Sequence, residues 1–325
     1  MEPLVFRATD IDEMASAFMG WQMDVIQQER GKFQGRLNGY SAAEGKINFY
    51  SAAIDRHVFA NGHHLPGSVM FTFIECPNAC TWNGEEVHPY KLFISDAERG
   101  LDLDAGKGFI SYSISIDKPL LEKWFWEEGV PTPGNWNFCL DFRKARRMET
   151  ARELHRIISN AVYSGKFIVS ELRLTLFEAL NPSSKQQLYR MSVNFVPIHE
   201  TVEMIHEAVR LGKEVNLEHV LQFYGGPMRT FYYNFKKYTG CTPHQYIKNL
   251  RLTAVHKMLK MADPNTVGVR EVAYQFGFRH LGQFAKDYNQ LFGEMPSHRL
   301  RRSCIESSLV CDMNLLTSPV GLESS

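Results

Sequence analysis

The 325-residue sequence predicts a multidomain α+β protein, in which a β-rich barrel or sandwich with a few helices precedes an all-α C-terminal domain. Three observations support this class. Short β-type segments separated by glycine turns run from about residue 21 to 117, and helical periodicity replaces them after Asp141. A helix–turn–helix pattern then occurs twice near the C-terminus. A chain of this length has room for two domains with cores of their own.

The β-rich domain is assigned to residues 1–140. Turn formers such as Asn38-Gly39, Asn61-Gly62 and Asn83-Gly84 separate its strands. Several short strands at close spacing are typical of a barrel or sandwich. A helix is expected over 120–128, where the glycine and proline residues that follow end it. The expected strands are 24–28, 33–37, 46–50, 69–75, 90–95 and 109–116.

Residues 141–197 are expected to form a helical linker. Its first helix carries an amphipathic stripe with steps of three and four residues. The stripe consists of Met148, Ala151, Leu154, Ile158 and Val162. A second helix over 170–180 ends at Asn181-Pro182. Two interpretations of the stripe stay open, namely packing within its own domain and a dimerisation helix in a homodimer.

The most informative pattern is a repeat within residues 198–302, in which each copy has a helix, a glycine turn and a second helix. Val220 and Gly225 of the first copy correspond to Val272 and Gly277 of the second, 52 residues later. The aromatic residues after the turn are 53 residues apart, so one residue has been inserted at the second turn. Two tandem helix–turn–helix units are typical of proteins that bind double-stranded DNA. The alternative is an ordinary helical bundle with a polar surface.

Residue types at the helix ends of the first copy predict its boundaries. The side-chain oxygen of Asn216 is suited to capping a helix over 217–224. Gly225-Gly226 permits a tight turn with positive φ, and Pro227 is expected at the first position of the second helix.

A long helix joins the two copies. Thr242 caps it, Pro243 begins it, and Asp263-Pro264 ends it after Met261. Its 19 residues span about 28 Å at 1.5 Å per residue, and successive major-groove faces of DNA lie about 34 Å apart. A rigid helix of this length is suited to holding two DNA-binding helices on one side of a duplex, with DNA bending taking up the difference.

The second helix of each copy has an inward aromatic face and an outward, mostly polar one. The inward positions are Phe231, Phe235 and Tyr238 in the first copy, and Phe284 and Tyr288 in the second. The candidate DNA-binding residues on the outward faces are Arg229, Thr230, Tyr232, Tyr233 and Lys236 in the first copy, and Arg279, His280, Gln283 and Lys286 in the second. Gln283 is suited to paired hydrogen bonds with adenine, and Lys286 to guanine or phosphate.

Charge is distributed unevenly, although the formal net charge is zero. Residues 200–302 carry 15 Lys and Arg against 9 Asp and Glu, a net charge of +6, which leaves −6 for the rest. The 44 residues from His219 to Ala262 hold seven basic side chains and no carboxylate. A charged run is usually a solvated face, but one that overlaps a helix–turn–helix unit is a candidate phosphate-binding surface.

Cysteine usage and hydropathy predict a cytoplasmic protein with reduced thiols and no membrane segment. The six cysteines lack the spacing of a disulfide framework, and the first 20 residues lack a basic segment before an apolar core. No run approaches the roughly 18 apolar residues of a membrane span. The serine-rich residues 303–325 are expected to form a disordered tail.

The sequence predicts no catalytic site, metal or cofactor. Suitable metal ligands are present at His57, His63, His64, Glu75 and His88. The adjacent pair His63-His64 would point to opposite sides of a strand, so both side chains cannot easily ligate one metal. No phosphate loop, nucleophile elbow or dinucleotide-binding motif occurs in the sequence.

The repeat resembles the DNA-binding region of AraC/XylS-type transcription regulators over roughly residues 201–302. The second motif is matched by Val272-Ala273-x-x-x-Gly277-Phe278, Phe284-Ala285-Lys286 and Phe292-Gly293-x-x-Pro296-Ser297. The first motif is matched by Gly240-Cys241-Thr242-Pro243 and Leu250-Arg251-Leu252. The sequence departs from the family pattern at Gly226-Pro227-Met228, at Leu281-Gly282 and at Met295.

The resemblance implies a bipartite seven-helix domain over residues 198–302 that binds promoter DNA and contacts RNA polymerase. The positions that match base-contacting positions of the family are Arg229, Tyr232, Tyr233, Leu281, Gly282, Gln283 and Lys286. It also implies that the β-rich part is a cupin-like sensor domain for a small-molecule effector of unknown identity, in a bacterial activator. The N-terminal part is loosely similar to ethanolamine-operon-type regulators. Two other classes stay open, namely a metal-dependent cupin-type enzyme with an ancillary DNA-binding domain, and a DNA-binding protein that takes no ligand.

Overall fold

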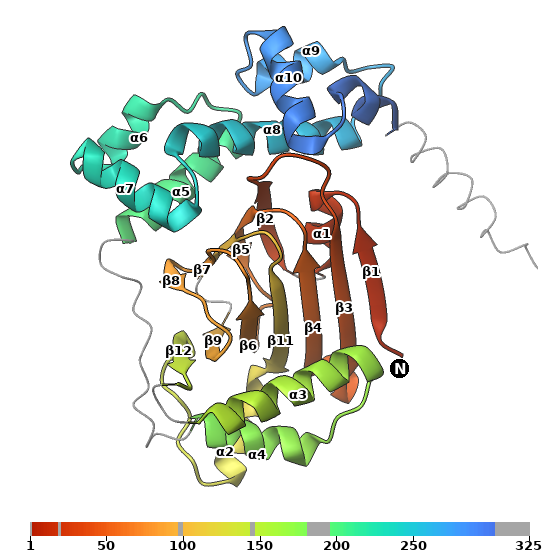
Figure 1. Ribbon diagram of the computed structural model, residues 1–325, viewed down its shortest axis with the longest axis vertical. Helices are drawn as coiled ribbons and strands as arrows, with labels where there is room; N and C mark the ends of the chain where they lie inside the picture. The colour runs from red at the N-terminus through yellow and green to blue at the C-terminus, as the bar shows by residue number, and fades with distance from the viewer. Residues whose placement is uncertain (1, 19–20, 97–99, 144–146, 181–195, 303–325) are drawn as a thin grey trace, which may run out of the picture.

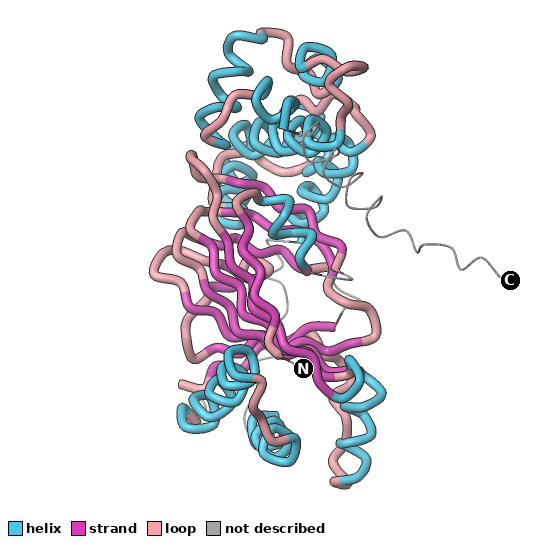
Figure 2. Tube along the Cα trace, turned by 90° about the vertical axis from the view of Figure 1, so that its right-hand side faces the viewer, coloured by secondary structure: helices cyan, strands magenta, loops and turns pink. Residues whose placement is uncertain are grey.

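The computed structural model describes residues 2–18, 21–96, 100–143, 147–180 and 196–302. The expected tail at 303–325 and the Asn181-Pro182 helix stop lie outside the described residues. Figure 1 shows three parts stacked along the long axis, with a helical C-terminal half, a β-rich middle and a group of helices at the far end. Figure 2 shows the same order from the side.

The N-terminal half, residues 2–180, contains two antiparallel sheets and four α-helices among its described residues. Its elements are β1 (Leu4–Ala8), α1 (Ile11–Ala17), β2 (Gln22–Gln27), β3 (Gly35–Ala42), a 3-10 turn (Ala43–Gly45), β4 (Ile47–Ile54), β5 (Val58–His63), β6 (Ser68–Glu75), β7 (Thr81–Trp82), β8 (Glu85–Glu86), β9 (Lys91–Asp96), β10 (Leu101–Ala105), β11 (Ile110–Asp117), α2 (Lys118–Glu127), β12 (Phe138–Asp141), α3 (Met148–Ser164) and α4 (Val169–Leu180).

The strands form two sheets, and the seven-stranded sheet has a core on each of its two faces. A seven-stranded sheet runs β1-β3-β4-β11-β6-β9-β12, and a five-stranded sheet runs β2-β5-β10-β7-β8. Side chains alternate between the two faces of each strand. On β6, Phe71 and Phe73 therefore pack against α2, α3 and α4, whereas Met70 and Ile74 belong to the core between the two sheets.

The six strands expected from the sequence are all present, each within a few residues of its predicted bounds. The sequence reasoning missed β1, α1, β5, β7, β8, β10 and β12. Strand β10 has the sequence Leu-Asp-Leu-Asp-Ala, and aspartate is uncommon in strands. Its two aspartates, Asp102 and Asp104, are nevertheless buried and hydrogen-bonded to histidines.

The amphipathic stripe on α3 packs within its own chain. Ala151, Leu154, Ile158 and Val162 are buried in the core formed with the seven-stranded sheet, whereas Met148 is 40% exposed. The intramolecular alternative therefore accounts for the stripe, and a dimer interface would need another surface.

The C-terminal half, residues 196–302, is helical. Its elements are α5 (Val196–Arg210), α6 (Leu217–Tyr224), α7 (Met228–Thr239), α8 (Pro243–Met261), α9 (Val269–Gln275) and α10 (Leu281–Phe292), and residues 296–302 are also helical. The long helix α8 contributes Tyr246 and Leu250 to one apolar cluster, and Val255 and Leu259 to a second. In the described residues, no helix is both long enough and apolar enough to cross a membrane.

Candidate nucleic-acid interface

The first helix–turn–helix unit consists of α6 and α7. The Asn216 side chain accepts a hydrogen bond from the His219 backbone N–H at 2.8 Å, which caps α6 as expected. Gly225 ends α6 with φ of 70°, a left-handed conformation that favours glycine. One detail of the prediction was wrong, because Pro227 lies at the N-cap and Met228 is the first residue of α7.

The two faces of α7 are separated as the aromatic spacing predicted. Phe231, Phe235 and Tyr238 are buried, and they fix the helix on the first apolar cluster. The candidate residues Arg229, Thr230, Tyr233 and Lys236 are exposed, with Tyr233 at 68%. Tyr232 is only half-buried because its ring packs against Phe231, with centroids 5.9 Å apart.

The second unit consists of α9 and α10. Gly277 forms the turn with φ of 81°, and Phe284 and Tyr288 pack inward. The candidate residues Arg279, His280, Gly282, Gln283 and Lys286 are exposed on or next to the start of α10. Leu281 is half-buried against the second apolar cluster, so less of it is available to a partner.

A carboxylate that sequence reasoning did not single out lies on this face. The Gln283 Nε2 group donates to Asp287 Oδ1 at 3.1 Å, and Lys248 Nζ lies 3.4 Å from the same oxygen. The i,i+4 spacing of Gln283 and Asp287 on α10 is the signal that would have revealed the pair. Asp287 thus holds the side chain that we expected to contact adenine.

The linker helix α8 has the predicted bounds, Pro243–Met261, with the Thr242 side chain accepting from the Gln245 backbone N–H at 3.4 Å. Its 19 residues span about 28 Å and connect the two units. Figure 1 shows α8 crossing the top of the β-rich part, with α6 and α7 near one end and α9 and α10 near the other.

Part of the carboxylate-free span from His219 to Ala262 contacts the N-terminal half and is not a free surface. Lys257 pairs with Asp24 at 3.1 Å, and Lys260 lies 3.9 Å from Asp10. Arg251 donates to the Val215 backbone carbonyl at 2.6 Å. The partners of these two lysines are carboxylates of the N-terminal half. The exposed basic residues Arg229, Lys236 and Lys237 remain on α7.

Among the described residues, buried histidine–aspartate pairs join the two halves at Asp10 and at Asp102. The His256 ring bridges Asp10, at 2.7 Å, and the Tyr288 hydroxyl, at 2.7 Å. Burial opposes ionisation of Asp10, but the hydrogen bond and charge of His256 outweigh it and hold the pKa of this carboxyl well below its usual range.

The second place is Asp102, which accepts from His199 at 2.5 Å and from the Tyr238 hydroxyl at 2.5 Å. Burial lowers the pKa of His199, but its hydrogen bond to Asp102 and the Asp102 charge raise it by more, so the net pKa lies above the ordinary value. This pairing favours a charged His199.

The candidate metal ligands do not come together. His57 is 2.5 Å from Asp104, and His88 is 3.3 Å from Asp141. His64 is buried beside Trp21, with ring centroids 5.8 Å apart. Within the described ranges, the clusters close enough to hold a metal are Asp10–Asp12–His256 and Asp102–His199–Glu203. The first cluster already has Lys257, Lys260 and Arg299 as cationic partners of its carboxylates. In the second cluster, Asp102 accepts a hydrogen bond from the Tyr238 hydroxyl.

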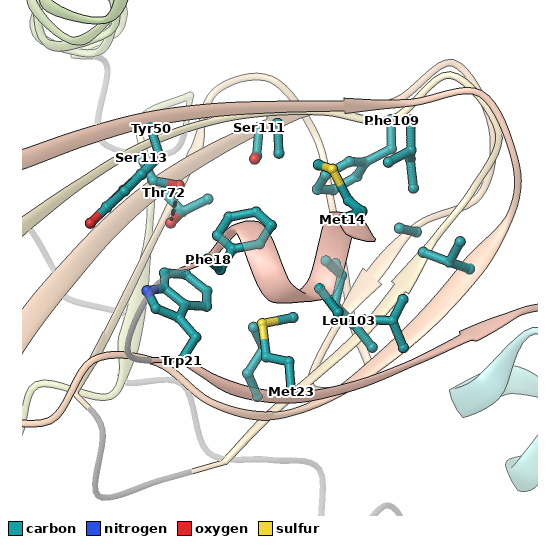
Figure 3. A pocket seen from close by; sticks show the side chains of 18 of the residues that line it. Met14, Phe18, Trp21, Met23, Tyr50, Thr72, Leu103, Phe109, Ser111 and Ser113 are labelled. Carbon is teal, nitrogen blue, oxygen red and sulfur yellow. Dashed lines mark hydrogen bonds between the residues drawn. The ribbon is translucent and has the colours of Figure 1, made fainter. Parts of the chain in front are cut away.

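A cavity of about 80 Å³ lies between the two sheets of the N-terminal half (Figure 3). Helix α1 supplies Met14 and Phe18 to its lining, and Trp21 follows on the way to β2. Among the described residues, its polar groups are the hydroxyls of Tyr50, Thr72, Ser111 and Ser113 and the indole N–H groups of Trp21 and Trp82, and the Thr72 and Ser113 hydroxyls lie 3.0 Å apart. Sequence reasoning did not identify this lining, although the alternation of apolar residues along β10 was a usable signal.

Comparison with known proteins decides the family. A helix-turn-helix domain model matches residues 224–302. The XylDLEGF operon transcriptional activator 2 of Pseudomonas putida is 38% identical over 109 residues, which cover 33% of this chain and 68% of that protein. The chain belongs to the AraC/XylS family of transcription regulators.

Other similarities to AraC/XylS proteins are shorter or cover less of the relative. The XylDLEGF operon transcriptional activator of Pseudomonas putida is 32% identical over 127 residues, which cover 39% of this chain and only 38% of that protein. A solved structure of a probable AraC family transcriptional regulator from Rhodopseudomonas palustris CGA009 is 30% identical, with a TM-score of 0.29, and covers 32% of this chain and 97% of that one. The chain thus spans about two thirds of the length of activator 2, but less than half the length of the XylDLEGF operon transcriptional activator.

Proposed function

We propose that this AraC/XylS-family chain is an effector-responsive transcription activator that binds promoter DNA with α7 and α10 in two successive major grooves. The observation that carries the proposal is the pair of exposed helix faces at the two ends of the rigid helix α8. Both faces stay exposed in the presence of the N-terminal half, so DNA has access to them.

The two faces suit different contributions to binding. On α7, Arg229 and Lys236 are suited to phosphates, and Tyr233 offers an exposed ring and hydroxyl. On α10, Gln283 and Lys286 are the side chains best suited to base edges, since Gly282 has no side chain and Leu281 is half-buried. We infer that α7 provides more phosphate affinity and α10 more sequence choice.

The remaining parts of the proposal follow from the family. RNA polymerase is the expected protein partner, a small molecule is the expected effector, and a homodimer in the bacterial cytoplasm is the expected working form. The N-terminal half provides the effector site, and we assign it no enzymatic role. Residues 1–140 are proposed as the sensor domain, 141–197 as the helical linker and 198–302 as the DNA-binding domain.

Genome-wide mapping of bound sites, followed by gel-shift titration of a mapped promoter at fixed salt, tests the proposal. We expect Gln283→Ala and Lys286→Ala each to weaken specific binding, since a good side-chain contact to a base contributes about 1–3 kcal/mol. Lys123→Ala, an exposed lysine on α2, is the matched control and should leave the affinity unchanged. Unchanged affinity of both α10 variants would remove this helix from the interface.

A further inference from the structure

The loop that joins β2 to β3 belongs to the N-terminal half but is attached to both helix–turn–helix units. The Gln28 Oε1 atom accepts from the Cys241 thiol, just after α7, at 3.3 Å and from the Asn249 amide of α8 at 2.9 Å. The Gly31 backbone N–H donates to the Gln290 carbonyl of α10 at 3.1 Å. Figure 1 shows β2 ending below α8, the helix that connects the two units. The loop therefore lies between the ends of α7 and α10.

The position of Arg30 in this loop is fixed by its neighbours. Gln27 is buried, and its Nε2 group donates to the Leu291 carbonyl of α10 at 2.7 Å. The same nitrogen lies 2.7 Å from the Glu29 carbonyl and 2.6 Å from the Gly31 carbonyl. Because the backbone is anchored on both sides of Arg30, this exposed residue is held beside α10 and does not project from a free loop.

Arg30 lines a polar hollow of about 110 Å³ between the loop, α8 and α10. The charged groups of its lining are Arg30, Lys248 and Asp287, which together give a net charge of one positive unit. Most of the other lining groups are side-chain amides of glutamine and asparagine, which can donate hydrogen bonds. A positive lining rich in hydrogen-bond donors is suited to an anionic oxygen.

The hollow adjoins the outward face of α10. Asp287 accepts from Gln283 at 3.1 Å and lies 3.4 Å from Lys248, so the carboxylate of the hollow already has a cationic partner. Gln290 also lines the hollow, and it follows Gln283 and Lys286 at helical spacing on the same side of α10. Within the described part of the chain, Arg30 forms no ion pair, so its charge is available to a partner on this side.

A duplex bound by both α7 and α10 runs along α8 and past this hollow. The two DNA-binding helices flank the ends of α8, and the phosphates of the duplex lie between successive major grooves. On α8, Gln245 is exposed and the Lys248 side chain is 37% exposed, and both line the hollow. Arginine suits a phosphate there, because its planar guanidinium can donate two parallel hydrogen bonds to phosphate oxygens.

We propose that Arg30 of the N-terminal half is part of the DNA interface and contacts a backbone phosphate beside the major groove that α10 occupies. This inference rests on the proposed DNA-binding function and adds a contact from outside the helix–turn–helix units. The contact contributes affinity without sequence choice, since phosphates are the same at every base pair.

Fluorescence anisotropy titration of a mapped promoter with the full chain, at several salt concentrations, tests the contact. We expect Arg30→Ala to lower the affinity by about fivefold, as an exposed ion pair allows. The slope of log K against log salt concentration should become shallower by about 0.9, the contribution of one neutralised phosphate. Arg30→Lys keeps the charge and should keep the slope. Arg152→Ala on α3, with a side chain 59% exposed, is the matched control and should change neither quantity.

The salt dependence separates a phosphate contact from a structural role. A wild-type affinity of Arg30→Ala, or a lower affinity with the wild-type slope, would overturn the proposal. The loss should be equal on DNA of unrelated sequence, and a loss confined to the promoter would also overturn it. Arg30→Gln removes the charge but keeps a polar side chain, and it gives the same readout if Arg30→Ala does not fold.

Failure of this contact is distinct from failure of the proposed function. A wild-type chain that does not bind the mapped promoter would refute the function itself. Promoter binding that weakens in Gln283→Ala and Lys286→Ala but is unchanged in Arg30→Ala would refute only the contact from the N-terminal half.

Discussion

The hydroxyl of Tyr238 provides a sharp test of how the two halves are joined. In Tyr238→Phe the ring keeps its packing against Phe59, and the hydrogen bond to Asp102 is lost. Asp102 is buried and also accepts from Asn61 at 2.6 Å and from His199 at 2.5 Å, so the substitution removes one donor from a buried carboxylate. Because hydrogen bonds to charged groups contribute about 1.5–3 kcal/mol, we expect a loss of about 2 kcal/mol in the free energy of unfolding.

The assay is equilibrium urea unfolding at pH 7, with the midpoint compared at a constant slope. Tyr274→Phe is the matched control, because this tyrosine is 36% exposed on α9 and stacks with Arg270 through its ring, which the substitution keeps. We expect the control to change the stability by less than about 0.5 kcal/mol, as is usual for surface substitutions. A Tyr238→Phe loss no larger than the control would refute the view that Asp102 ties α7 to the five-stranded sheet.

Three further measurements probe other parts of the structure. Gly240→Ala should destabilise the protein more than Gly225→Ala in the same urea assay. Both glycines have φ near 70°, but a Cβ at Gly240 would lie 2.7 Å from the Asp104 carboxylate, whereas Gly225 faces open space. Equal losses of stability would contradict this packing. Phe284→Ala should cost about 3–5 kcal/mol and impair folding along with DNA binding, and a folded variant with wild-type stability would place this ring outside the core. Because the pKa of His199 is raised in the folded protein, its pairing with Asp102 stabilises the fold fully below the ordinary pKa of histidine and progressively less as the pH rises through the folded pKa. His199→Gln should therefore flatten the fall in stability above pH 6.5. An unchanged profile of stability against pH would exclude this pair as the source of the fall.

The sequence was most informative where local chemistry alone determines structure. The Asn216 and Thr242 caps, the Gly225 turn and the proline at the start of α8 place the ends of α6 and α8 correctly, since each depends on a few neighbouring residues. The β-type segments and the turn formers between them likewise located most of the longer strands. The positions of exposed side chains on α7 and α10 followed from helical periodicity, which is also a local property.

Contacts between distant segments were beyond this kind of reasoning. Asp102 and Asp104 made β10 look unlike a strand, because the histidines that satisfy them, His199 and His57, lie far away in the sequence. The destination of Lys257 was equally hidden, since its partner Asp24 is 233 residues away. The cavity depends on the pairing order of two sheets, which one sequence does not specify.

The ion pairs of the linker helix have a consequence for how the protein meets DNA. Lys257 and Lys260 on α8 lie next to carboxylates of the N-terminal half, which neutralise the charge on that side of the helix. A DNA backbone approaching this side meets neutral pairs and releases fewer of its own counter-ions than it would at free lysines. We therefore expect sequence-independent attraction to act mainly at the exposed basic residues of α7 and α10, such as Arg229, Lys236 and Lys286.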